Sequence, residues 1–225
     1  MKRSEINSNI KDTLAWLETL NVHLPPFAYW TPEDWASKGH EYDEIRENML
    51  GWDVTDYGRG DFDKVGLLLF TLRNGNLENP KYAKEYAEKV LVCKVGQLSP
   101  NHFHWHKTED IINRGGGTLM LQLWNSTPEG ELDSTAVAVR TDGRSFAIPA
   151  GGKVFLKPGE SITLTPGTYH LFASEGEKVL AWEVSMVNDD LTDNRFYETQ
   201  ARFTDIEEDE KAQYLLCNEY PKAGG

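Results

Sequence analysis

The most informative part of this chain is the stretch NHFHWHKTE at residues 101–109. It holds three of the six histidines of the sequence within five residues, a density that no secondary-structure preference explains. Because residues i and i+2 of a strand share one face, His102 and His104 can direct both imidazoles to one interior point. Phe103 and Trp105 then face the opposite side. The stretch therefore predicts a β-strand with a metal-binding face.

Further ligands should lie beyond this strand. Imidazole is a preferred ligand of borderline divalent metals, and a carboxylate returning on the next strand, such as Glu109, can complete the set. A metal held by one hairpin would hang at its edge, so another ligand should come from a distant strand. His170 follows the turn Pro166-Gly167 and begins an apolar run. We expect four side chains to bind one divalent metal: His102, His104, Glu109 and His170.

Short β-like runs surround these residues, separated by Gly, Pro and Asn at close spacing. They occupy residues 90–95, 119–124, 136–140, 161–164, 169–173 and 179–187. The intervals are too short for crossover helices, so the sheet should be largely antiparallel. The pattern predicts an all-β fold, a barrel or a sandwich.

The N-terminal part has a different pattern. Apolar residues recur at helical spacing from Ile6 to Leu17 and mark one face of an amphipathic helix, which needs a partner surface. Shorter helices are expected near residues 32–39 and 42–50, and from Asn79-Pro80 to residue 88. We expect three parts along the chain: a helical extension packed on the barrel at 1–88, the barrel core at 89–188, and a C-terminal segment at 189–225.

Composition limits the classes of function. The 225 residues carry a formal net charge of -13, so nucleic acid and anionic membranes would repel the protein. No apolar run approaches the length of a membrane span, and the first residues lack a secretory signal, so the expected location is the cytoplasm. Two cysteines, Cys93 and Cys217, are too few for a disulfide framework.

The spacing of the ligands resembles the two cupin motifs. Gly96, His102-x-His104, Glu109 and Gly116 match the first motif closely, whereas the second is weaker. In the second motif Gly159 precedes Pro166-Gly167-x-x-His170, but that glycine follows its proline directly and Ser174 stands where cupins usually have Asn. The resemblance implies a double-stranded β-helix with a metal site in the barrel, and it assigns the ligands to His102, His104, Glu109 and His170.

The wider string HFHWHKTEDIINRGGG at residues 102–117 resembles the bacterial D-lyxose isomerase family. Members of that family are cupin-type aldose–ketose isomerases that use a divalent metal, usually manganese, and form dimers. The resemblance implies a monosaccharide substrate, D-lyxose and D-xylulose or a close pair such as D-mannose and D-fructose. It also implies a homodimer and a manganese cofactor, with zinc, iron and cobalt as other possible metals.

The reaction moves a proton between adjacent carbons through a cis-enediol, so it needs an acid/base pair beside the metal. Lys107 lies between two ligands in sequence and could polarise a substrate oxygen. Glu183 is an acid in an apolar strand and is the general-base candidate if it faces the interior. A hydride shift is the other route. Three further residues are candidates for substrate contacts together with Lys107: His106, Asp190 and Arg195.

Two other functions remain open at this point. A cupin dioxygenase could hold iron(II) with the same ligands, because imidazole and carboxylate accept several divalent ions. A non-catalytic sugar-binding cupin is the second. An isomerase of a small polyol needs interior polar groups and an acid/base pair, whereas an oxygenase of an apolar substrate needs an apolar lining.

Overall fold

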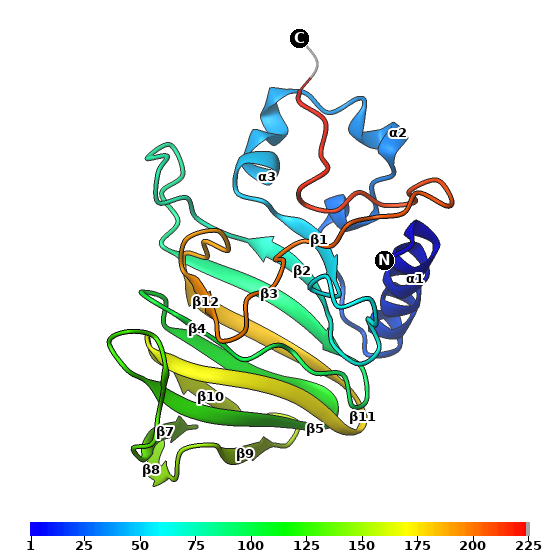
Figure 1. The fold of residues 1–225 in the computed structure, drawn as a ribbon. Coiled ribbons are helices and arrows are strands. Elements are labelled where there is room, and N and C mark those ends of the chain that lie inside the picture. The colour runs from blue at the N-terminus through cyan, green and yellow to red at the C-terminus, as the bar shows by residue number, and fades with distance from the viewer. Residues whose placement is uncertain (224–225) are drawn as a thin grey trace.

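The computed structural model describes residues 1–223, which fold into a strand-rich barrel with helices at one end (Figure 1). The helices, α1 to α3 and the 3-10 turns η1 and η2, all precede the first strand: α1 Arg3–Thr19, η1 Pro26–Tyr29, α2 Pro32–Trp35, η2 His40–Tyr42 and α3 Asp43–Glu47. The strands are β1 Gly51–Thr55, β2 Leu67–Arg73, β3 Tyr86–Cys93, β4 His102–His104, β5 Glu109–Ser126, β6 Leu132–Asp133, β7 Val137–Thr141, β8 Arg144–Ile148, β9 Gly152–Leu156, β10 Ser161–Leu164, β11 Thr168–Met186 and β12 Asn194–Phe196.

Two long antiparallel strands, β5 and β11, hold the barrel together. Their first pairing segment runs from Thr168↔Asn125 to Glu175↔Thr118, and a second runs from Val179↔Gly116 to Ser185↔Glu109. Where β11 passes the second segment it also pairs with β3, and β5 pairs there with β10. In the first segment the outer neighbours are β4 and β9 instead. The strand pair therefore belongs to two layers, and the space between the layers is the barrel interior.

The change of layer depends on a glycine in β5. Gly116 has a φ of +86°, and a Cβ at this position would lie 1.9 Å from the carbonyl oxygen of Lys178. The backbones of β5 and β11 approach too closely here for any side chain, and the left-handed conformation also favours glycine. This explains why a glycine-rich run interrupts the strand.

Two hydrophobic cores lie on either side of the β3 end of the sheet. Alternate β3 residues, Leu91 and Cys93, face the barrel interior, while Val90 and Val92 face the helical part. Helix α1 covers the outer face with its apolar stripe, and Ile6, Ile10 and Leu17 are buried there. The apolar face of this helix is therefore satisfied within the chain.

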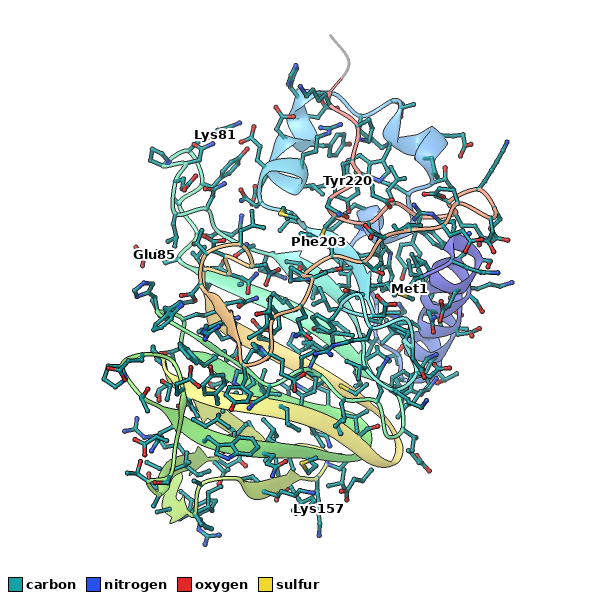
Figure 2. All side chains as sticks on the ribbon, viewed as in Figure 1. Met1, Lys81, Glu85, Lys157, Phe203 and Tyr220 are labelled. Carbon is teal, nitrogen blue, oxygen red and sulfur yellow. The ribbon has the colours of Figure 1, made fainter. Side chains whose placement is uncertain are left out.

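The C-terminal segment returns to the helical end of the molecule. Tyr220, labelled among all the side chains in Figure 2, stacks on Trp35 with ring centroids 4.1 Å apart and donates to the carbonyl oxygen of Leu50. Arg3 of α1 pairs with Glu208 and Glu219 of this segment. None of the helices in the described residues is long and apolar enough to cross a membrane.

The all-β fold expected from the sequence is confirmed, with differences in the N-terminal part. The prediction of a helix after Asn79-Pro80 is wrong. The Asn79 side chain accepts a hydrogen bond from the backbone N–H of Lys81, which makes a turn, and strand β3 begins at Tyr86. Strands β1 and β2 also lie within residues 1–88, and both join the barrel sheet. Their runs are buried on both faces and lack the alternation that marks a half-buried strand.

Candidate metal and sugar site

Three histidines meet inside the barrel, as the sequence predicts. The pairing of β4 with β11 sets His170 opposite His102, and His104 shares the inward face of β4. One ring nitrogen from each of the three lies within 4.8 Å of the others. The Nδ1 atoms of His102 and His170 lie 2.8 Å and 3.0 Å from the carbonyl oxygens of Pro100 and Thr168. A proton on Nδ1 leaves the Nε2 lone pair free for a metal.

Glu109 joins the three histidines from the start of β5. Its Oε1 lies 3.2 Å from His170 Nε2 and its Oε2 lies 3.4 Å from His104 Nε2. Burial lowers the pKa of His102 and His104, so both imidazoles are neutral and able to coordinate. Three imidazole nitrogens and one carboxylate are a donor set that fits a divalent transition metal.

Lys107 and Glu183 form a buried pair beside the ligands. Lys107 Nζ donates to Glu183 Oε1 at 2.9 Å and lies 2.8 Å from Glu109 Oε2. Burial favours the neutral lysine, but the two carboxylates outweigh it and raise the pKa of Lys107. Burial opposes ionisation of Glu183 as well, yet the pKa of Glu183 is lowered because Lys107 and Lys89 lie close. Both side chains are therefore charged at neutral pH.

Lys89 and Asn188 complete this polar cluster, and both were missed from the sequence. Lys89 on β3 lies 3.2 Å from Glu183 Oε1 and donates to Asn188 Oδ1 at 2.6 Å. Strand alternation could have found the lysine, because Lys89 shares its inward face with Leu91 and Cys93. Asn188 follows the end of β11, and nothing in the neighbouring sequence indicates that its side chain belongs to the site.

A second buried ionic cluster joins three distant parts of the chain. Arg202 of the C-terminal segment lies 2.7 Å from Asp53 of β1 and 2.7 Å from Asp190 after β11. Burial raises the pKa of Asp53, whereas Arg202 outweighs burial at Asp190 and holds that pKa well below its usual range. Asp190, which the sequence suggests as a substrate contact, and Arg202 both line the cavity at the histidines.

Two other residues predicted to contact the substrate, Arg195 and His106, do not line that cavity. Arg195 pairs in register with Phe103 when β12 joins β4, so it shares the face turned away from His102 and His104. His106 is exposed because the chain turns away after His104, and it lines another cavity together with Lys107, Asp189 and Thr192. Its backbone N–H donates to Asp193.

Three aromatic residues of the N-terminal part, Trp30, Trp52 and Tyr57, lie at different distances from the cavity. Tyr57 lines the cavity, where its ring meets Phe196 edge to face. Trp52 belongs to the core under α1, and Trp30 packs against Trp35 in the helical part. Only Tyr57 of these three therefore reaches the site.

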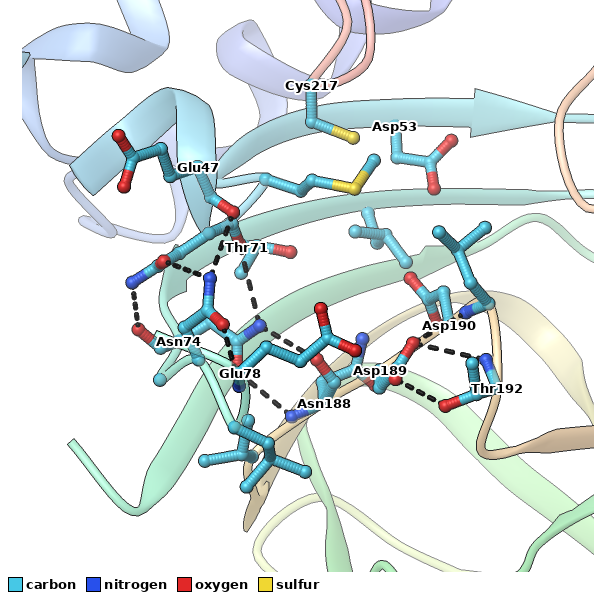
Figure 3. Close-up of a pocket in the computed structure, with 18 residues that line it drawn as sticks. Glu47, Asp53, Thr71, Asn74, Glu78, Asn188, Asp189, Asp190, Thr192 and Cys217 are labelled. Atoms are coloured by element: carbon cyan, nitrogen blue, oxygen red, sulfur yellow. Dashed lines mark hydrogen bonds between the residues drawn. The ribbon is translucent and has the colours of Figure 1, made fainter. Parts of the chain in front are cut away.

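The cavity at the histidines is small and adjoins a larger one. It measures about 40 Å³, room for one or two water molecules. The neighbouring cavity, drawn in Figure 3, measures about 230 Å³, and Leu69, Asn188 and Asp190 line both. Its lining includes five acids and, within the described residues, no lysine or arginine: Glu47, Asp53, Glu78, Asp189 and Asp190.

Solved structures of sugar isomerases share this fold. The L-ribose isomerase of Acinetobacter sp. DL28 in complex with L-ribose matches with a TM-score of 0.62 at 15% identity, covering 92% of this chain and 98% of that chain. The enzyme of Cellulomonas parahominis matches with a TM-score of 0.57 at 14% identity over the same shares. The barrel, with its interior histidine cluster, therefore has the cupin fold that these enzymes share.

The sequence relationship is more specific. The family model for D-lyxose isomerase matches residues 1–220. The D-lyxose/D-mannose isomerase of Serratia proteamaculans is 48% identical over 224 residues, 98% of each chain, and that of Escherichia coli O157:H7 is 46% identical over 223 residues, again 98% of each. The chain belongs to the D-lyxose isomerase family, and the enzyme is an aldose–ketose isomerase.

Proposed function

We propose that the enzyme interconverts D-lyxose and D-xylulose, or the related pair D-mannose and D-fructose, by proton transfer through a cis-enediol. The observation that carries the proposal is the buried pair of Lys107 and Glu183 beside the four candidate ligands. The names of the Serratia and Escherichia relatives, D-lyxose/D-mannose isomerase, agree with these sugars.

The proposed acid/base work belongs to Glu183 and Lys107. Glu183 is a carboxylate held in a water-poor interior, so it can take the proton from the carbon next to the carbonyl and return it to the neighbouring carbon. Lys107 is a cation within reach of the same space and stabilises negative charge as it develops on the sugar oxygens. A bound divalent cation supplies Lewis acidity to those adjacent oxygens.

The cavities support an uncharged sugar. The space at the histidines is too small for a whole pentose, so the rest of the sugar would extend past Asn188 and Asp190 into the larger cavity. The acids around that cavity can accept hydrogen bonds from hydroxyls and would repel a phosphate. Asp190 is the proposed hydroxyl contact at the boundary.

Manganese is the proposed cofactor, held by His102, His104, Glu109 and His170. The imidazoles and the carboxylate also suit zinc, iron and cobalt, so the donor atoms alone favour none of them. Metal content of the purified enzyme and reactivation of metal-free enzyme by each ion distinguish these cofactors.

The oligomeric state and the division of the chain are further parts of the proposal. We propose a homodimer, supported by large apolar side chains that remain exposed on the single chain, among them Leu77, Met186 and Leu191. We also retain the division into an N-terminal part at 1–88, a barrel at 89–188 and a C-terminal segment at 189–225. Light scattering at micromolar concentration tests the dimer, which a monomer mass would reject.

The activity itself is tested with sugars. Enzyme loaded with manganese is incubated with a panel of pentoses and hexoses, and ketose formation is followed. We expect turnover of D-lyxose or D-mannose and none of their phosphorylated forms. Absence of ketose from every sugar, with metal bound, would reject the proposal.

A further inference from the structure

The two oxygens of Glu183 have very different surroundings. Oε1 is contacted by three groups: Lys107 Nζ at 2.9 Å, Ser185 Oγ at 3.1 Å and Lys89 Nζ at 3.2 Å. Oε2 accepts no hydrogen bond from any residue in the range 1–223 that the structure describes. A carboxylate fixed through one oxygen presents the other to whatever enters the cavity.

We propose that Lys89 is a positioning residue for the isomerisation: together with Lys107 it holds Glu183 by Oε1, so that Oε2 is the atom that exchanges the proton with the sugar. This rests on the proposed role of Glu183 as the base. Lys89 acts through Glu183 and does not itself move a proton.

The contacts of Lys107 explain why this lysine alone is insufficient to hold the Glu183 carboxylate. Lys107 is shared, because its ammonium lies 2.8 Å from Glu109 Oε2 as well as 2.9 Å from Glu183 Oε1. Lys89 supplies a second positive charge to Glu183 from β3, and the two residues are direct partners in the strand register. The Glu183 carboxylate therefore does not depend only on an ammonium that it shares with the candidate ligand Glu109. An uncompensated buried carboxylate is costly and tends to take up a proton.

Asn188 fixes the two ammonium groups relative to each other. Its Oδ1 accepts from Lys89 Nζ at 2.6 Å and from Lys107 Nζ at 3.0 Å, so each lysine bridges Asn188 and Glu183. The backbone of Asn188 is held in turn by Asn74, which accepts from its N–H and donates to its carbonyl oxygen, both at 2.9 Å (Figure 3). Lys89 is therefore restrained at both of its contacts.

The test compares Lys89→Met with Lys89→Arg in the metal-loaded enzyme. Lys89→Met should lower kcat by about 10- to 100-fold with little change in KM, because a mobile and partly protonated Glu183 reacts less often while sugar contacts remain. The acid limb of the rate profile should move to higher pH by about one unit, since loss of a neighbouring cation raises the pKa of a carboxylate. Lys89→Arg keeps the charge and should keep the wild-type acid limb.

Controls separate positioning from packing. Lys94→Met removes a lysine just beyond β3 that pairs with exposed Asp63, and it should leave kcat, KM and the acid limb unchanged. Where Lys89→Met folds poorly by circular dichroism, Lys89→Gln provides a polar side chain without charge and should show the same shift of the acid limb. The charged groups facing Glu183 in these variants are Lys107 and Glu109, and neither is altered.

The outcomes distinguish this proposal from the function on which it rests. If wild-type enzyme forms ketose and Lys89→Met or Lys89→Gln keeps the wild-type kcat and acid limb, Lys89 has no positioning role. A raised KM with unchanged kcat would make Lys89 a sugar contact instead and would also overturn the proposal. Wild-type enzyme that forms no ketose from any sugar rejects the isomerase function itself, before Lys89 is tested.

Discussion

The ammonium of Lys107 donates to Glu183 Oε1 over 2.9 Å, although 76 positions separate the two residues in the chain. Lys107 stands in the turn between β4 and β5, and Glu183 stands in β11 opposite Ile111 of β5. The long pairing of β5 with β11 brings them together. The same pairing places the acid/base candidates beside the histidines, so the geometry of the site is a property of the barrel.

Loss of one imidazole should abolish metal binding. His104→Ala removes a buried donor from the centre of the cluster, and we expect less than stoichiometric divalent metal after dialysis, measured by elemental analysis. His106→Ala is the matched control, because this histidine is exposed and outside the cavity, and it should retain the wild-type metal content. One tightly bound metal per chain in His104→Ala would remove the proposed site.

Neutralising the base should stop the reaction without unloading the metal. Glu183→Gln should reduce kcat by about 10²- to 10⁴-fold, the usual scale for general-base catalysis, with metal content unchanged. Product formed by wild-type enzyme in deuterated water should carry some deuterium at the transferred position, because a base that exchanges its proton with solvent brings solvent hydrogen to carbon and a hydride shift does not. Glu177→Gln, exposed on the same strand, should behave as wild type. Full retention of the original hydrogen together with near-normal turnover in Glu183→Gln would favour a hydride shift.

Replacement of Arg202 should lower the free energy of unfolding. Arg202→Met leaves Asp53 and Asp190 buried without their cation, and breaking such a pair typically costs about 3–5 kcal/mol of unfolding free energy. Urea unfolding at neutral pH measures this loss. The deficit should shrink as the pH falls, because protonation of Asp53, whose pKa is raised, relieves the unpaired charge. A deficit that stays constant with pH would contradict this account.

The stability of the metal-free protein should also report on Glu183. The pKa of this carboxyl lies below its ordinary value of 4.5 in the folded state, so its ionised form stabilises the fold above pH 4.5. That contribution is lost as the pH falls through the lower, folded-state value. The difference in urea midpoint between wild type and Glu183→Gln should therefore be largest at neutral pH and decrease in acid. A difference that grows in acid would show the opposite sign of the shift.

The bend of the barrel strands should be sensitive to one glycine. Gly116→Ala places a methyl group on the carbonyl of Lys178 at a positive φ, and we expect severe destabilisation or failure to fold. Gly143→Ala has a similar φ of +81° with no atom within 4 Å, so it should cost only the backbone strain, about 1–2 kcal/mol. Thermal melting measures both variants: the melting temperature should fall much further in Gly116→Ala, which adds a steric clash, than in Gly143→Ala, which adds only backbone strain.

The fold class and the clustering of the histidines could be predicted from the sequence because both depend on local patterns. The alternation of His102 and His104 on one strand follows from the two-residue period of β-structure, and the short intervals between strands exclude crossover helices. Glu183 is a general-base candidate only if it faces the interior. The pairing of β11 with β3 and β5 gives its side chain that orientation.

Other parts of the site depend on contacts between distant segments. Lys89, Asn188 and Arg202 come from a strand, a loop and the C-terminal segment, and only the folded barrel brings their charges together. The orientation of Arg195 could not be predicted, because it follows from the register of β12 against β4, which the chain's own periodicity does not specify. Local patterns predict the barrel and the shared inward face of His102 and His104, because strand alternation is a local property. Which charged side chains line the cavity depends on the folded chain, because burial and ion pairing depend on what packs opposite each side chain.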